Sequence, residues 1–284
     1  MSTATPDSRQ KDARLLFYDD FRSGALDRSK WNVRITGGIV NNEQQAYVDS
    51  ADTIYFVSGE EAPGAEHNAL VIHPRHRPGY VTPEGRRFDF ISGRMDTRET
   101  FDFCYGTATA RIWLPSGAGL WPAFWLLGYG SWPDAGEIDI LEYVGEPDWV
   151  SAAAHGPGYF GEGGLSNKWF FPNDGDADAW HVYAVDWGPD RLIFQVDGRT
   201  IYRVTRPMVD FFGPWVFDNR KFLILNFALG GVYPFKINGV RESYYGLPDA
   251  TVNLIKNDQV RLLVDWVKVE AAAGSAEERA GVPA

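Results

Sequence analysis

The clearest pattern in the chain is an alternation of large side chains along residues 119–128. On a β-strand, side chains two residues apart point to the same face of the sheet. The alternation therefore predicts a strand with two distinct faces. One face carries Trp121, Ala123, Trp125 and Leu127, and the other carries Phe124 and Leu126.

Similar alternation predicts further strands along the rest of the chain, at residues 69–73, 105–115, 180–187, 191–196, 199–204, 222–229 and 260–269. Asp197 and Gly198 form a two-residue hairpin signal between two of them. The basic, proline-containing stretch 73–79 is interpreted as a solvated loop. We find neither a repeat nor an interdomain linker. The sequence thus predicts one domain over residues 15–270, with disordered tails at 1–14 and 271–284.

Composition narrows the class of protein. A chain of 284 residues is normal for a single β-sandwich, and 11 Trp residues suit a surface that stacks on sugar rings. The net charge of −11 argues against nucleic acid as a partner. A single cysteine, Cys104, excludes an internal disulfide. No apolar run has transmembrane length, and residues 1–14 lack the apolar core of a signal peptide.

Three acids interrupt the apolar run at residues 136–145. Glu137 and Asp139 are two apart, so they share one face of a strand. Glu142 is an odd number of residues from both, and a regular strand would turn it away. A β-bulge at residues 140–141 adds one residue and returns Glu142 to the face of the other two acids.

Carboxylates in this arrangement suit the hydrolysis of glycosidic bonds. A solvated strand face would intersperse lysine and arginine, because adjacent like charges repel. A retaining glycosidase needs two carboxyl groups about 5–5.5 Å apart. With the bulge discounted, Glu137 and Glu142 lie about 13 Å apart along the strand, and long side chains can close most of that gap. Asp139 between them can keep their pKa values apart.

The Glu-x-Asp-x-x-Glu segment and its flanks resemble glycoside hydrolase family 16 over about residues 17–270. The spacing is the bulged variant of laminarinases, agarases and carrageenases. The resemblance implies an all-β jelly-roll sandwich of two bent antiparallel sheets with a concave substrate cleft. It also implies that Glu137 is the nucleophile, that Glu142 is the acid and base, and that Asp139 holds Glu137 in place.

The same resemblance suggests residues that contact the sugar. For Asn42 the alternative is an exposed loop residue, and for Arg94 a structural ion pair. The tryptophans at 121 and 125 either floor the cleft or pack in the core, and the histidine at 155 contacts Asp139 or a sugar hydroxyl, or is structural. The full set of substrate-binding candidates is Asn42, Arg94, Trp121, Trp125, Trp132, His155 and Asn226.

No cofactor is expected for catalysis. Family members often hold a structural Ca²⁺ on the convex face, and the resemblance implies Asp265 and Asp20 as its ligands, with carbonyl groups and waters completing the site. The alternative is that Asp265 is a plain surface acid. His73 and His76 lack acids or cysteines at ligand spacing, so we do not expect them to bind metal.

The sequence therefore predicts a retaining endo-β-glycosidase acting on β-1,3-glucan or mixed β-1,3/1,4-glucan. The alternatives are a glucan-binding protein without activity, a transglycosylase, or a galactan hydrolase of the same family. Sulfated galactans should be repelled by an acidic protein without a basic cleft. Val232, Tyr233 and Pro234, followed by an insertion-like loop to 246, replace the shorter Asn-Trp-Pro of many laminarinases and leave the glucan preference open.

We expect a monomer whose partner is a polysaccharide, with no nucleic acid or membrane partner. The substrate implies an extracellular enzyme, although no signal peptide is present in this sequence.

Overall fold

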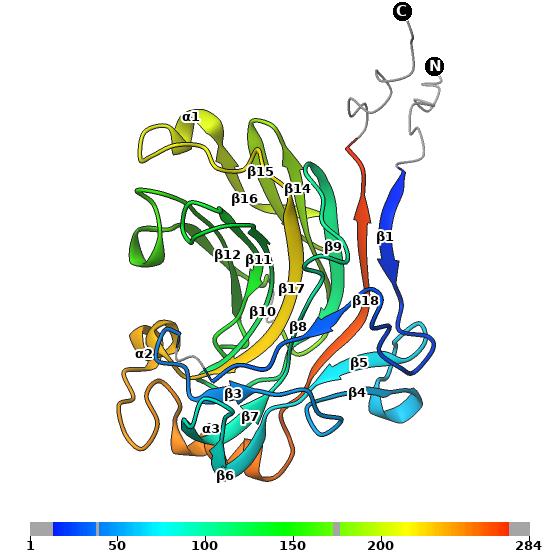
Figure 1. The fold of residues 1–284 in the computed structure, drawn as a ribbon, viewed down its shortest axis with the longest axis vertical. Helices are drawn as coiled ribbons and strands as arrows, with labels where there is room; N and C mark the ends of the chain where they lie inside the picture. The colour runs from blue at the N-terminus through cyan, green and yellow to red at the C-terminus, as the bar shows by residue number, and fades with distance from the viewer. Residues whose placement is uncertain (1–13, 38–39, 173–176, 273–284) are drawn as a thin grey trace, which may run out of the picture.

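The computed structural model describes residues 14–37, 40–172 and 177–272. The predicted tails, 1–14 and 271–284, lie outside the described residues except for 14, 271 and 272. Two large, bent antiparallel sheets lie face to face (Figure 1). The predicted all-β sandwich is confirmed.

The first sheet forms the outer layer. Its strands run in the order β16-β15-β14-β9-β18-β5-β4, and β1 also pairs with β18. Their bounds are β1 (Leu15–Asp19), β4 (Ile54–Val57), β5 (Ala69–Ile72), β9 (Gly106–Trp113), β14 (Trp180–Gly188), β15 (Arg191–Val196), β16 (Arg199–Thr205) and β18 (Leu262–Glu270). Because β1 pairs with β18, the two ends of the described chain lie side by side on this layer.

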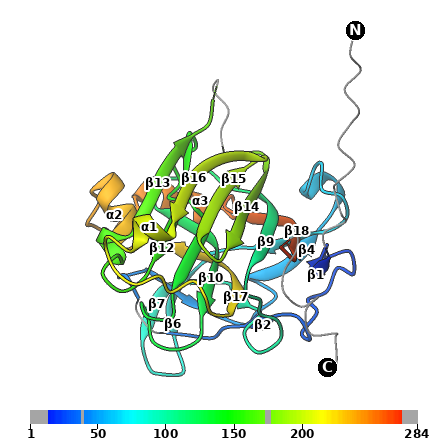
Figure 2. The same cartoon turned by 90° about the horizontal axis from the view of Figure 1, so that it is seen from above.

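The second sheet forms the inner layer and curves strongly (Figure 1). Its order is β13-β12-β11-β10-β17-β8-β2. The bounds are β2 (Asn32–Val33), β8 (Arg94–Asp96), β10 (Leu120–Gly128), β11 (Glu137–Glu142), β12 (Trp149–His155), β13 (Leu165–Phe170) and β17 (Lys221–Leu229). The acidic strand β11 is thus an interior strand of the sheet, between β10 and β12 (Figure 1). Figure 2 shows the same layers from above.

A third, three-stranded sheet extends one end of the molecule. It contains β3 (Gln45–Tyr47), β7 (Arg87–Ser92) and β6 (Arg75–Val81), with β3 parallel to β7. The prediction of a loop over 73–79 is therefore wrong. The pairing of β6 with β7 is irregular between His76 and Tyr80. That irregularity accommodates Pro78, which has no N–H to donate to a ladder.

Alternation along each strand explains the core. Phe124 and Leu126 of β10 are fully buried between the two sheets, whereas Trp121 and Trp125 on the opposite face remain partly exposed. Leucine, valine and phenylalanine side chains of β14, β15 and β18 cover the same core from the outer sheet. Burial of this apolar surface, worth about 25 cal/mol per Å², holds the sheets together.

Helices are few and short in the described residues. They are η1 (Gly59–Glu61), η2 (Gly161–Gly163), α1 (Arg206–Val209), α2 (Val232–Asn238) and α3 (Asp249–Lys256). The segment from Pro234 to residue 246 was predicted to be an insertion-like loop, but its first part belongs to the helix α2. None of the described helices has the length and apolar character needed to cross a membrane.

Candidate active site

The bulge in β11 decides where the acids point. Trp125 of β10 pairs with Asp139, but the preceding Phe124 pairs with Leu141, so Ile140 is the extra residue. On the other side, Asp139 pairs with Ala153 and Glu142 pairs with Ser151, three steps on β11 against two on β12. The predicted bulge at residues 140–141 is confirmed.

Both faces of β11 follow from this bulge. Ile138, Ile140 and Leu141 are buried in the core. Glu137, Asp139 and Glu142 line a cleft of about 410 Å³ on the concave face of the inner sheet. A regular strand would have placed Glu142 in the apolar layer, where an unpaired carboxylate is strongly destabilised.

Burial and mutual repulsion keep protons on these acids. Burial, with the charge of Asp139 second, raises the pKa of Glu137 to about 8. The same two causes raise the pKa of Glu142 to about 8, and burial raises the pKa of Asp139 to about 8. Because the three acids are coupled, at least one of them stays protonated near neutral pH, and the charge of His155 favours ionisation of Glu137.

His155 lies across from the nucleophile candidate. It pairs with Glu137 in the β11–β12 ladder. Its Nε2 lies 3.2 Å from Oδ2 of Asp139 and 3.9 Å from Oε1 of Glu137. The charge of His155 lowers the pKa of Glu137 against the larger effect of burial. The expected neighbourhood of His155 and Asp139 is confirmed, and its contact with sugar stays a prediction.

The carboxyl group of Glu142 contacts an indole that packs against helix α2. Trp121 Nε1 donates a hydrogen bond of 3.1 Å to Oε1 of Glu142. Tyr233, on helix α2, packs edge-on against the Trp121 ring with centroids 5.7 Å apart. The hydroxyl groups of Tyr233 and Ser151 are 3.0 Å apart. Helix α2 therefore contributes an aromatic wall beside the acid/base candidate.

A chain of hydrogen bonds runs under the other half of the cleft. Trp125 Nε1 donates to Oδ1 of Asn226 at 2.7 Å, and Asn226 Nδ2 donates to the Tyr47 hydroxyl at 3.0 Å. That hydroxyl donates to Oε2 of Glu43 at 3.4 Å. Trp125, Asn226 and Glu43 all line the cleft. The predicted residues Trp125 and Asn226 thus line the cleft as expected. Hydrogen bonds to neighbouring residues orient the Trp125 indole and the Asn226 amide.

Arg94 also lines the cleft, with its guanidinium carbon 5.0 Å from the centre of the Trp125 ring. Its Nε is buried and has no hydrogen-bond partner among the described residues. This donor suits a sugar hydroxyl. The stacking on Trp125 favours the predicted cleft position over the alternative of a structural ion pair.

Trp132 lies at the rim and is 48% exposed. Its ring packs edge-on against Phe160 at 5.3 Å and lies 6.5 Å from the ring of His155. An exposed aromatic ring beside the catalytic cluster is available to stack on a sugar.

Two predicted sugar-binding residues are not among those that line the cleft: His155, which contacts Asp139, and Asn42. Asn42 lies in a turn at φ +57°, is exposed, and its carbonyl accepts a 2.6 Å bond from Gln44. Its neighbours Asn41 and Glu43 line the cleft instead. The left-handed turn at 41–42 rotates the chain, which the sequence pattern did not reveal.

Three further residues at the site were not among the predicted ones. They are Glu43, Tyr47 and Tyr233. The first two alternate with Gln45 at period two, a signal that could have placed them on one face. Burial raises the pKa of Glu43, against hydrogen bonds from Gln45 and Tyr47 that lower it.

The residues predicted to bind calcium do not fit a cation. Oδ2 of Asp265 forms an ion pair with Arg111, and its Oδ1 accepts a 2.9 Å bond from the N–H of Glu66. Asp20 is paired with Arg22, with a 2.6 Å hydrogen bond. Positively charged and N–H donors thus occupy the oxygens that a calcium ion would need.

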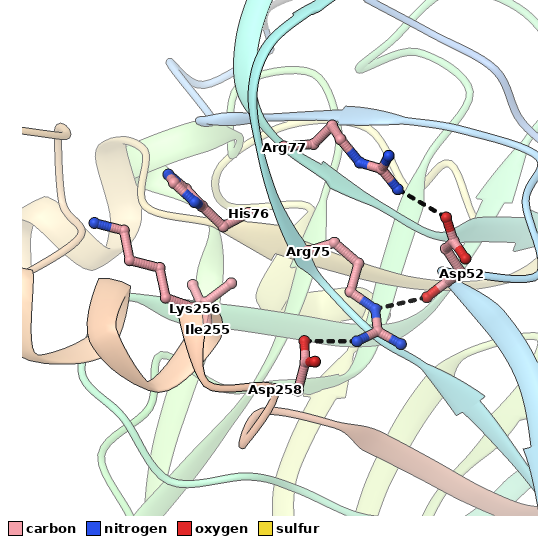
Figure 3. Close-up of a pocket in the computed structure, with 7 residues that line it drawn as sticks. All are labelled: Asp52, Arg75, His76, Arg77, Ile255, Lys256 and Asp258. Carbon is pink, nitrogen blue, oxygen red and sulfur yellow. Dashed lines mark hydrogen bonds and ion pairs between the residues drawn. The ribbon is translucent and has the colours of Figure 1, made fainter.

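A second pocket, on the outside of the molecule, has a different character (Figure 3). Arg75 is paired with Asp258 at 2.6 Å, and Arg77 is paired with Asp52 at 2.8 Å. The charges therefore largely satisfy one another. The perturbed acids, the aromatic floor and the free arginine donor are found together only in the cleft of the inner sheet, among the pockets of the described residues.

Comparisons with known proteins agree with this geometry. The profile described as "Glycosyl hydrolases family 16" matches residues 43–216. A beta-glucanase from Rhodothermus marinus is 36% identical over 233 residues, covering 77% of this chain and 76% of the relative. A glucan endo-1,3-beta-glucosidase from Cryptopygus antarcticus is 32% identical over 228 residues, covering 75% and 79%. The solved structure of an endo-beta-1,3-glucanase from Pyrococcus furiosus has a TM-score of 0.78 and 33% identity, covering 92% of this chain and 96% of that one.

Proposed function

The chain belongs to glycosyl hydrolase family 16, and from this premise we propose that it is an endo-β-1,3-glucanase that retains the anomeric configuration. One observation carries the proposal. The β11 bulge brings Glu137 and Glu142 to the same wall of the cleft, with Asp139 between them. Double displacement requires two carboxyl groups that flank the scissile bond, one as nucleophile and one as proton donor.

In the first step, a carboxylate oxygen of Glu137 attacks the anomeric carbon. A new ester bond forms as the bond from that carbon to the glycosidic oxygen breaks, and the proton of Glu142 passes to the leaving oxygen. The raised pKa of Glu142 means that this proton is still present near neutral pH. The Trp121 N–H keeps the carboxyl group oriented during transfer.

In the second step, the ionised Glu142 removes a proton from water. The water oxygen attacks the same carbon, the ester bond to Glu137 breaks, and the product keeps its configuration. As an ester, Glu137 no longer repels Glu142, so the pKa of Glu142 falls and the residue can act as a base. Asp139, beside His155, stays in the cluster throughout and tunes both acids.

The cleft lining supports a neutral glucan as substrate. Trp121 and Trp125 offer aromatic faces, and Asn226 and Arg94 offer polar groups. Arg94 is the only arginine or lysine among the residues that line the cleft. A sulfated galactan would face the acids without compensating charge, which disfavours it. A binding protein without activity would have no need for three buried acids with raised pKa values.

A substrate panel tests the proposal. The purified chain is incubated with laminarin, mixed-linkage β-glucan, agarose and carrageenan, and the products are sized. We expect laminarin to be cut internally into short oligosaccharides, with the β-anomer formed first by NMR. Release of the α-anomer first would contradict the retaining mechanism, and products longer than the substrate would indicate a transglycosylase.

We also expect the protein to act as a monomer outside the cell, because a polymeric substrate does not cross a membrane. Size-exclusion chromatography with light scattering measures the first point. A dimer at working concentration would contradict it.

A further inference from the structure

Lys221 is a lysine with no exposed surface. It is the first residue of β17 and pairs with Gly128 of β10. Aromatic rings of Trp187 and Phe217 lie 5.9 Å and 5.4 Å from its ammonium group. Lysine is rarely buried in this way, because its charge loses the solvation of water.

Neutral oxygen atoms around the ammonium replace that water. Nζ donates to the carbonyl oxygen of Ala135 at 2.8 Å and of Gly136 at 3.1 Å. It also donates to Oδ1 of Asn219 at 2.7 Å, and the carbonyl oxygen of Val216 lies at 3.3 Å. Asn219 in turn donates to the Ala135 carbonyl at 3.1 Å. The ammonium therefore ties the loop before β11 to the loop before β17.

The position of this tie is significant for catalysis. The Gly136 carbonyl belongs to the peptide group that joins Gly136 to Glu137, the first residue of β11. Gly136 has φ +69°, and a Cβ there would lie 2.5 Å from the Val216 oxygen and 2.8 Å from Nζ. Only glycine fits, and the lysine fills the space that a side chain would occupy.

The buried ammonium costs stability. Burial lowers the pKa of Lys221 to about 7, while the Cys104 thiol and Glu137 act in the opposite direction. A well-packed apolar side chain of similar length would avoid the desolvation cost. The Lys221 ammonium therefore does not lie against the Gly136–Glu137 peptide group because it stabilises the fold. Its position is better explained by a need to hold that peptide group in place.

We propose that Lys221 is a positioning residue for the nucleophile. Its ammonium fixes the carbonyl groups of Ala135 and Gly136, and so fixes where β11 begins and where the carboxylate of Glu137 stands. The proposal rests on the proposed function, because that function assigns Glu137 as the nucleophile. Lys221 touches neither substrate nor reacting atoms and acts through the backbone of Ala135 and Gly136.

The test is the full-length Lys221→Met variant, which keeps the length of the side chain but removes its charge and donors. We expect kcat on laminarin to fall roughly ten- to a hundredfold with KM within about threefold, because a small misplacement of a reacting group costs rates of this order. The rate at which a 2-deoxy-2-fluoro laminaribioside with a good leaving group labels Glu137 should fall in parallel, because this reaction reads nucleophilic attack directly.

Two further variants keep the outcome decisive. Arg220→Met changes the adjacent basic residue, which pairs with Asp102 away from the catalytic loop, and should behave as wild type. Asn219→Ala removes one partner of the lysine and decides the matter if Lys221→Met fails to fold. A folded variant of Lys221 or Asn219 with kcat and labelling rate within twofold of wild type overturns the proposal. Wild-type inactivity on laminarin would instead count against the proposed function.

Discussion

The indole N–H of Trp121 donates a 3.1 Å hydrogen bond to Oε1 of Glu142, so the acid/base candidate is held by the floor of the cleft itself. This bond favours the ionised carboxylate and lowers its pKa, against the larger raising effect of burial. The same contact that positions the acid for the first step thus prepares the base for the second.

Replacing Trp121 by phenylalanine keeps an aromatic floor and removes this donor. Without the bond the pKa of Glu142 should rise further, so the alkaline limb of the kcat profile should move to higher pH. The base-catalysed second step should slow roughly tenfold or more, within the range of general-base effects. Trp125→Phe is the matched control, because it loses a bond to Asn226 and leaves Glu142 untouched. An alkaline limb that moves equally in both variants would contradict the assignment.

The two glutamates should respond differently to the leaving group. Glu137→Gln should abolish turnover of every substrate, by more than about a hundredfold, because the covalent step is lost. Glu142→Gln should fail on laminarin but still react with a dinitrophenyl glycoside, whose leaving group needs no proton. Burst kinetics with that glycoside measure the difference, and a burst from Glu137→Gln would reverse the two roles.

Asp139 should set the alkaline edge of activity. Its charge is one of the causes that raise the pKa of Glu142. Glu142 must be protonated to start the reaction, so activity is lost as pH rises through this value. Asp139→Asn removes the charge and should shift the alkaline limb to lower pH and reduce kcat. A limb that stays in place, measured from pH 5 to 10, would show that Asp139 does not tune the acid.

The buried acid Glu137 should also make the folded protein less stable as the pH rises toward 8. The folded-state pKa of Glu137 is raised to about 8, so folded protein binds this proton more tightly than unfolded protein does. The resulting stability is present at low pH and is lost as pH rises toward 8. The melting temperature of Glu137→Gln should therefore be at least about 3 °C above that of wild type at pH 8. At pH 4 the two melting temperatures should be equal. Glu60→Gln, at an exposed acid, serves as the control and should show no such divergence.

The outer sheet should not depend on calcium. Both oxygens of Asp265 already accept from Arg111 and Glu66, so excess EDTA should leave the melting temperature unchanged. Arg111→Met should destabilise the protein by on the order of 3 kcal/mol, because it leaves the buried carboxylate without its partner. Thermal unfolding with and without chelator measures both effects. If EDTA lowered the melting temperature and added calcium raised it again, Asp265 and Asp20 would have to be reconsidered as calcium ligands.

Local patterns predicted many of the strands, although not β6, and they predicted the bulge. The faces of β10 and β11 depend only on residue spacing, which is why the tryptophans and the acids lie where expected. The arrangement around them depends on contacts between distant segments. Tyr233 reaches Trp121 only because α2 folds back over the cleft, and no spacing in the sequence reports that.

Three misses have different physical origins. Residues 73–79 were predicted to be a loop because prolines interrupt them, but residues 75–81 form an edge strand whose irregular pairing accommodates Pro78. Asn42 was predicted to contact the sugar, but Asn41 and Glu43 line the cleft instead. Side-chain direction in a turn depends on the backbone φ, which composition does not encode. Lys221 was overlooked because burial of a lysine runs against its usual preference.

Because of the bulge in β11, Asp139 and Glu142 share one face of the strand although they are an odd number of residues apart. Between Asp139 and Glu142 the chain has two residues, Ile140 and Leu141, and both face the core. Removing one of them would leave a regular strand on which the acids still alternate with apolar residues and still share a face. Evolution can therefore pass between the longer and the shorter spacing by a single-codon deletion without turning either glutamate away. What changes is the local bend of the strand, and with it the shape of the floor on which the sugar lies.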